Sequence, residues 1–213
     1  MNKIYRIGLG LCSIIGLAAV SCGKLDVVGT DSVRAFGDML KALPPDAAAS
    51  GGGGNWSISA PDKSARFMWT SEGAAIIFDI TPFVNAGLDV SAFDSIRNGV
   101  MVIGRVSSTA GQEPADPLED FAGIVKTRRG TIGYHGALDH YGVNLGSGNL
   151  FEWAKDMRTN DKDIVFVLDP EPFITAGADP ARIEGWTFAK VTVDNENGKP
   201  VQVDKILKPF NLL

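Results

Sequence analysis

The sequence is poor in the residues that most often carry chemistry, with two cysteines and two histidines among 213 residues. Two cysteines exclude a disulfide-dense scaffold and a cysteine-rich zinc module. Basic residues are not in excess either, since 20 Lys and Arg stand against 25 Asp and Glu, which argues against nucleic acid as a partner. The motifs of serine hydrolases, zinc proteases, phosphate-binding loops and CxxC redox proteins are missing as well. This composition favours a non-enzymatic role, and no catalytic residue is assigned.

Apolar residues, by contrast, make up 45 % of the chain, enough to bury a core and to exclude disorder over most of its length. A first apolar run, residues 7–20, follows the basic residues Lys3 and Arg6. This run is too short to cross a hydrocarbon layer of about 30 Å comfortably and is typical of an export signal. It ends in small residues before Cys22, in the sequence AVSC. This ending resembles the lipobox of bacterial lipoproteins.

The resemblance implies that residues 1–21 are a lipoprotein signal peptide, that Cys22 is lipidated, and that residues 22–30 tether the body to a membrane. Cys12 would leave with the leader. A diacylated cysteine anchors a protein at the cell envelope without spanning the bilayer. Gly23 after the cysteine, in place of Asp, favours the outer over the inner membrane if the host is Gram-negative and sorts lipoproteins as enteric bacteria do. The alternative is an ordinary secretory signal that happens to end near a cysteine.

The rest of the chain is interpreted as an internal duplication. The segment DITPFVNAGLD at residues 79–89 recurs as DPEPFITAGAD at residues 169–179, with six of eleven positions identical. At roughly 7 % per residue type, an arbitrary pairing would give about one match. Aromatic residues farther upstream recur in the same order. Phe36, Trp56, Phe67 and Trp69 match Phe121, Tyr141, Phe151 and Trp153.

We therefore predict two copies of an α-β-β-β-α-β unit, at residues 31–106 and 117–213, joined by a linker at residues 107–116. Each copy opens with a helix, capped by Asp31 or Ser32 in the first copy and by Asp116 in the second. A hairpin and an apolar strand follow, and then a short helix that ends at Gly87 or Gly177. The second copy carries an extra C-terminal hairpin. Sequential strands with short connections favour an α+β fold, with a mainly antiparallel sheet and helices packed on one face.

His135, Asp139 and His140 form the candidate metal site. Two imidazoles with a carboxylate between them could ligate a divalent metal such as zinc, copper or nickel. The first copy has neither histidine nor carboxylate at the aligned positions, so these side chains are an addition to the shared fold. The three side chains converge only if the backbone is irregular, because neither a helix nor a strand places all three on one face. The alternative is a surface loop with ordinary histidines; no other cofactor is predicted.

Two further sets of residues allow both a structural and a functional interpretation. The repeated aspartates could bind a cation, but Asp89 and Asp179 are placed as N-caps of short helical segments. The strand aromatics could stack on a sugar or another flat ligand, but repeated aromatics on strands usually form a core. These aromatics are Trp56, Trp69, Tyr141, Trp153 and Trp186. We favour the structural interpretation in both cases.

Together these features predict a lipid-anchored lipoprotein of the bacterial cell envelope with a non-enzymatic role, either binding a ligand or partner or supporting structure. Its partners would be the membrane, through Cys22, and an unidentified small molecule or envelope protein. Two alternatives stay open. One is a metal- or histidine-dependent enzyme that uses residues 134–141. The other is a solute receptor that binds in the cleft between the copies, because duplicated folds often form pockets there.

Overall fold

The computed structural model describes the chain from Cys22 to Phe210 with short gaps. The described residues are 22–44, 47–51, 53–107, 113, 116–128, 130–158, 160, 162–195 and 197–210. The predicted signal peptide, residues 1–21, and most of the predicted linker, residues 107–116, lie outside them. Among the described helices, none combines the length and the apolar character needed to cross a membrane.

The first copy folds into a long helix, a sheet and two short helical turns. Its elements are α1 (Cys22–Ala42), β1 (Ala48–Gly51), β2 (Asn55–Ser59), β3 (Ala65–Thr70), β4 (Gly73–Asp79), α2 (Thr81–Asn85), η1 (Val90–Ala92), β5 (Ile96–Arg97) and β6 (Val100–Gly104). All described strand pairs are antiparallel, and the six strands lie in the order β1-β2-β3-β4-β6-β5.

The second copy repeats this arrangement element by element. It comprises α3 (Pro117–Thr127), β7 (Ile132–His135), β8 (His140–Asn144), β9 (Leu150–Ala154), β10 (Ile164–Leu168), α4 (Glu171–Thr175), η2 (Pro180–Arg182), β11 (Thr187–Asp194) and β12 (Pro200–Pro209). Its antiparallel sheet, read from β7, has the order β7-β8-β9-β10-β12-β11, the same order as the first sheet. The prediction of an α+β fold with a duplicated unit and antiparallel sheets is thus confirmed.

The repeated unit is larger than the predicted α-β-β-β-α-β. An additional strand, β1 or β7, precedes the predicted hairpin in each copy, and the C-terminal hairpin expected only in the second copy is present in both. β5 has two residues and β1 has the sequence AASG, so neither contains the apolar alternation that predicts a strand. The short strands are recognisable only through their pairing with longer neighbours.

Helix α1 begins at Cys22, so residues 22–30, predicted as a tether, are helical. Asp31 and Ser32, predicted as alternative N-caps, lie inside the helix. The Asp31 carboxylate pairs with Arg34 at 3.2 Å, and the Ser32 hydroxyl donates to the carbonyl oxygen of Gly29 at 2.9 Å. Their polar groups are satisfied within the helix, and α1 begins well before either predicted cap. In α3 the predicted cap is correct, because Asp116 accepts hydrogen bonds from the second and third residues of the helix.

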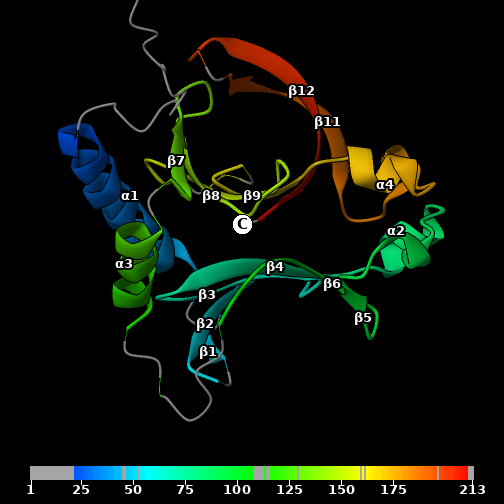
Figure 1. Cartoon of the computed structure of the whole chain (residues 1–213), viewed down its shortest axis with the longest axis horizontal. Helices are drawn as coiled ribbons and strands as arrows, with labels where there is room; N and C mark the ends of the chain where they lie inside the picture. Colours follow the sequence, from blue (N-terminus) through cyan, green and yellow to red (C-terminus); the bar gives the residue numbers. More distant parts are fainter. Residues whose placement is uncertain are drawn as a thin grey trace, which may run out of the picture.

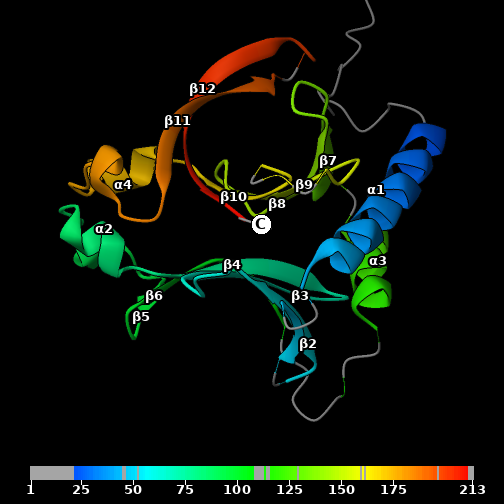
Figure 2. The same ribbon diagram turned by 180° about the vertical axis from the view of Figure 1, so that it is seen from behind.

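The two sheets lie face to face, with α1 and α3 at one end and α2 and α4 at the other (Figure 1). Figure 2 shows the same arrangement from behind, with β11 and β12 curling over the outer face of the second sheet. Helix α3 packs on β3 of the first sheet, and α1 packs on β7 and β9 of the second. Each long helix therefore lies against the sheet of the other copy, which interlocks the two units around one core.

Equivalent aromatic residues meet across the centre of the molecule. The rings of Phe36 and Phe121 stack with centroids 3.8 Å apart, and those of Phe67 and Phe151 stack at 4.1 Å. Each pair joins one residue to its own counterpart in the other copy, as a pseudo-two-fold axis requires. Trp69 and Trp153 flank the first stack edge-on and are fully buried. These aromatics form the core, as the structural interpretation predicted.

The axis also passes between Gly87 and Gly177, which end α2 and α4. Both have positive φ, +106° and +93°, as predicted for glycines that terminate a helix. The backbone N–H of Asp89 donates to the carbonyl of Ala176, and that of Asp179 donates to the carbonyl of Ala86, at 2.8 and 2.9 Å. The repeated motif therefore builds a reciprocal contact between the copies. Its aspartates cap η1 and η2, since each side chain accepts a hydrogen bond from the second residue of the turn.

Candidate functional site

The two histidines lie opposite each other on the hairpin formed by β7 and β8. His135 and His140 are direct cross-strand partners, so both side chains project from the same face of the second sheet. Asp139 lies in the connecting turn with a φ of +56°. Its carboxylate accepts a short hydrogen bond from the Tyr134 hydroxyl, and this bond raises the pKa of Tyr134 to about 12. Asp139 therefore stabilises the turn instead of joining the histidines.

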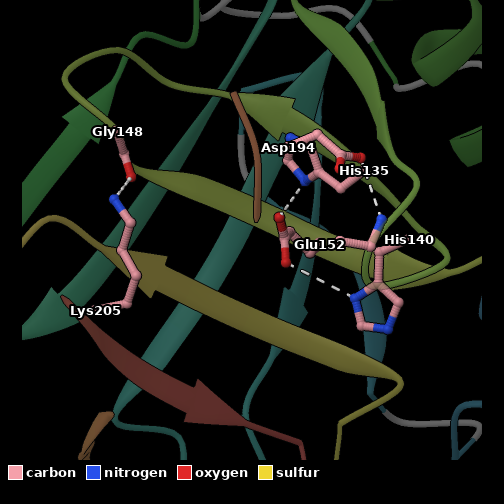
Figure 3. A network of polar contacts seen from close by, with 7 residues as sticks. His135, His140, Gly148, Glu152, Asp194 and Lys205 are labelled. Carbon is pink, nitrogen blue, oxygen red and sulfur yellow. Dashed lines mark hydrogen bonds and ion pairs between the residues drawn. The ribbon is translucent and has the colours of Figure 1, made fainter. Parts of the chain in front are cut away.

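The carboxylate that does meet the histidines belongs to Glu152 on β9. Oε1 of Glu152 lies 2.6 Å from Nδ1 of His135, and Oε2 lies 3.7 Å from Nδ1 of His140. Both rings point toward this carboxylate (Figure 3). The Glu152 side chain is 4 % exposed, although the strand alternation directs it away from the core that holds Phe151 and Trp153. The His–Glu–His cluster thus lies on the outer face of the second sheet, under the curl of β11 and β12.

Opposing effects set the charges in this cluster. Burial alone would raise the pKa of Glu152, but the hydrogen bond from His135 and the interaction with His140 outweigh burial and hold that pKa below its ordinary value of 4.5. The same hydrogen bond raises the pKa of His135 above 6.5 against the opposing effect of burial. The pair is therefore most stable as a carboxylate with a protonated imidazole.

The turn between β7 and β8, which carries the histidines, contacts β11 at the opposite edge of the sheet. The carboxylate of Asp194, at the end of β11, accepts a hydrogen bond from the backbone N–H of Ala137 at 3.1 Å. A Cβ at Gly136 would lie 3.0 Å from the same carboxylate, so the turn and β11 are in close contact. The first and last strands of the second sheet are thus joined, and the charge of Asp194 adds to the rise in the pKa of His135.

The structure does not bring the three predicted metal ligands together. Asp139 bonds Tyr134, whereas His135 and His140 direct their Nδ1 atoms at Glu152. Within the described ranges there is no group of three or more His, Cys, Asp or Glu side chains placed to hold a metal ion. The structure therefore lends the metal prediction no support and assigns the histidines a carboxylate partner that sequence reasoning missed.

The pairing of His135 with Glu152 predicts a stability maximum at mildly acidic pH. Because the folded pKa of His135 is raised, its contribution is complete below pH 6.5 and is lost as pH rises through the folded value. Because that of Glu152 is lowered, its contribution is present above pH 4.5 and is lost as pH falls through the folded value. The free energy of unfolding should fall by about 1–2 kcal/mol above the maximum. Urea denaturation at several pH values measures this, and in Glu152→Gln the decline above pH 6.5 should be absent.

A second candidate site is a cavity of about 360 Å³ between the two copies. We call it the inter-copy cleft. The first copy contributes residues 73–74 and 104–105, and the second contributes Arg128, Thr131 and residues 144–145. Its walls are the start of β4 and the end of β6 on one side, and the end of α3 with the end of β8 on the other. Two arginines, Arg105 and Arg128, line it without any carboxylate among the lining residues.

Comparisons with protein-family models, with curated proteins and with solved structures found no match to this chain.

Proposed function

We propose that the protein is a lipid-anchored lipoprotein of the bacterial cell envelope whose duplicated body binds a small ligand between its two copies. The observation that carries the binding role is the inter-copy cleft, which at about 360 Å³ is within the range of small-molecule sites. The cleft lies where two equivalent units meet, and its lining contains several groups that can hydrogen-bond. The lipidation of Cys22, and with it an outer-membrane location in a Gram-negative host, rests on the lipobox-like sequence.

The anchoring is tested by metabolic labelling with radioactive palmitate. The unmodified chain is expected to incorporate label, and Cys22→Ala is expected to abolish incorporation, because the acyl chains are attached to this sulfur. Cys12→Ala is the matched control, since it removes the other cysteine of the chain and should leave labelling unchanged. Labelling that persists in Cys22→Ala, or that is absent from the unmodified protein, would contradict the lipoprotein assignment.

The binding role is tested by hydrogen–deuterium exchange of the full chain in the presence of small solutes. A bound solute is expected to slow amide exchange in residues 73–75 and 104–106, which border the cleft. The hairpin of β11 and β12 lies outside the cleft and serves as the internal reference. Protection spread equally over both regions would indicate a general effect on stability and would contradict binding in the cleft.

A further inference from the structure

The duplication allows the inter-copy cleft to be compared with the counterpart site to which the pseudo-two-fold axis relates it. Backbone hydrogen bonds that occur in both copies identify which residues of the two copies are equivalent. The N–H of Arg105 donates to the carbonyl of Ala74, as the N–H of Phe210 donates to that of Ile164. The N–H of Arg128 donates to the carbonyl of Ile124, as the N–H of Leu43 donates to the carbonyl of Met39. Arg105 therefore corresponds to Phe210, and Arg128 corresponds to Leu43.

The cleft and its counterpart differ in chemistry although they share a fold. At the counterpart site Phe210 is 1 % exposed, with its ring centroid 5.3 Å from that of Phe166, and Leu43 is 7 % exposed. These side chains belong to the continuous apolar core. At the cleft, Arg105 and Arg128 are exposed. The counterpart site is thus filled by apolar side chains, whereas the cleft is open and carries two guanidinium groups.

The two arginines lie near the same point of the first sheet. The position that a Cβ would occupy at Gly73 is 2.4 Å from the carbonyl oxygen of Arg105 and 3.7 Å from Cζ of Arg128. The absence of a side chain at Gly73 therefore leaves room for the Arg128 guanidinium beside the strand. Over the described part of the chain, neither guanidinium has a hydrogen bond or an ion pair. Both keep their donors available to a ligand.

Polar substitutions extend to the remaining wall of the cleft. The N–H of Asn144 donates to the carbonyl of Thr131, as the N–H of Ser59 donates to that of Ala47, so Thr131 replaces an alanine. The Asn144 side-chain oxygen accepts from the N–H of Gly146 at 2.9 Å, which leaves the amide NH₂ group as a donor. The cleft therefore offers two guanidinium groups, an amide and a hydroxyl.

This set of donors suits one chemical class. Guanidinium groups bind carboxylate and phosphate oxygens through paired, charge-assisted hydrogen bonds. No carboxylate is among the residues that line the cleft, so the lining does not neutralise the charge of the arginines. We infer that the inter-copy cleft binds a small oxyanion, a phosphate or carboxylate group, through Arg105 and Arg128, with Thr131 and Asn144 as further donors. This inference rests on the proposed binding function and names its ligand class.

The test is isothermal titration of the purified full chain at low salt with inorganic phosphate, with succinate and with vesicles that contain phosphatidylglycerol. Binding of phosphate or succinate is the expected result and identifies a free oxyanion as the ligand. Binding of the vesicles alone would identify a lipid headgroup as the source of the same chemistry. In either case Arg105→Gln and Arg128→Gln should each weaken binding about tenfold or more, because each removes a charge-assisted contact. Arg66→Gln, an exposed arginine on β3 outside the cleft, should leave binding unchanged.

A second variant separates loss of the site from loss of the fold. Arg105→Phe/Arg128→Leu gives the cleft the side chains of its sealed counterpart, so it is expected to fold with an unchanged or higher Tm and to bind no anion. Anion affinity that survives in this variant or in both glutamine variants would overturn the inference. If no anion binds but glucose slows exchange at residues 73–75, the oxyanion class is wrong while the binding function stands. If no solute slows exchange at these residues, both the oxyanion inference and the proposed binding function are contradicted.

Discussion

Replacing Phe121 with alanine is expected to lower the free energy of unfolding by about 3–5 kcal/mol. The ring is fully buried and stacks on Phe36 at 3.8 Å with an interplanar angle of 2°, and Trp153 contacts its edge. Truncation removes the contact on the axis between α1 and α3 and leaves a cavity that two rigid helices cannot close. A loss of this size is a large part of the 5–15 kcal/mol that stabilises a typical domain. Urea denaturation followed by tryptophan fluorescence measures it.

Phe188→Ala is the matched control for this substitution. Phe188 lies on β11 and is 38 % exposed, so the same change of side chain removes far fewer contacts and should cost less than about 1 kcal/mol. Because the buried residues of both copies form one continuous cluster, Phe121→Ala is also expected to unfold in a single transition. Equal losses in the two variants, or separate transitions for the two copies, would show that Phe121 does not join the units as the structure describes.

The features that sequence reasoning predicted correctly are those encoded locally. The motif at residues 79–89 and 169–179 specifies a proline-led helical turn, a glycine with positive φ and a capping aspartate within eleven positions. Each of these depends on neighbours along the chain, so the pattern is readable from the sequence. The short strand β5 and the swapped packing of α1 and α3 depend on distant partners, and no local periodicity predicts them.

The His–Glu–His cluster shows why the candidate site was only partly predictable. His135 and His140 stand out in the sequence because histidine is rare in this chain and the two are close together. Glu152 is 17 residues from His135, in the strand LFEWA, where an ionisable residue between two core aromatics is the only signal. The corresponding residue of the first copy is Met68, since Phe67 and Trp69 match Phe151 and Trp153. A comparison of the two copies singles out Glu152, because its position carries a charge in the second copy and none in the first.

The inter-copy cleft is even harder to predict from the sequence than the His–Glu–His cluster. Arg105 and Phe210 are 105 positions apart, whereas the offsets of the recognisable matches are 84, 85 and 90. An arginine and a phenylalanine share no feature that would align them. Their equivalence follows from the pairing of β4 with β6 and of β10 with β12. The arrangement of the strands is therefore needed before the asymmetry between the cleft and its counterpart becomes visible.

Gly87→Ala is expected to lower the free energy of unfolding by about 3 kcal/mol, the second of the two largest effects. The residue has a φ of +106°, which costs an alanine about 1–2 kcal/mol, and the added Cβ would lie 2.9 Å from the carbonyl oxygen of Gly177. Relieving that contact separates the copies and weakens the two reciprocal backbone hydrogen bonds on the axis. Gly99→Ala is the control, because Gly99 also has a positive φ, +79°, but a Cβ there meets no atom within 4 Å. Urea denaturation of both variants separates the effect of the contact from that of the backbone conformation. In Gly99→Ala the free energy of unfolding should fall only by the cost of placing an alanine at positive φ. Equal losses in the two variants would mean that Gly87 and Gly177 do not hold the copies together.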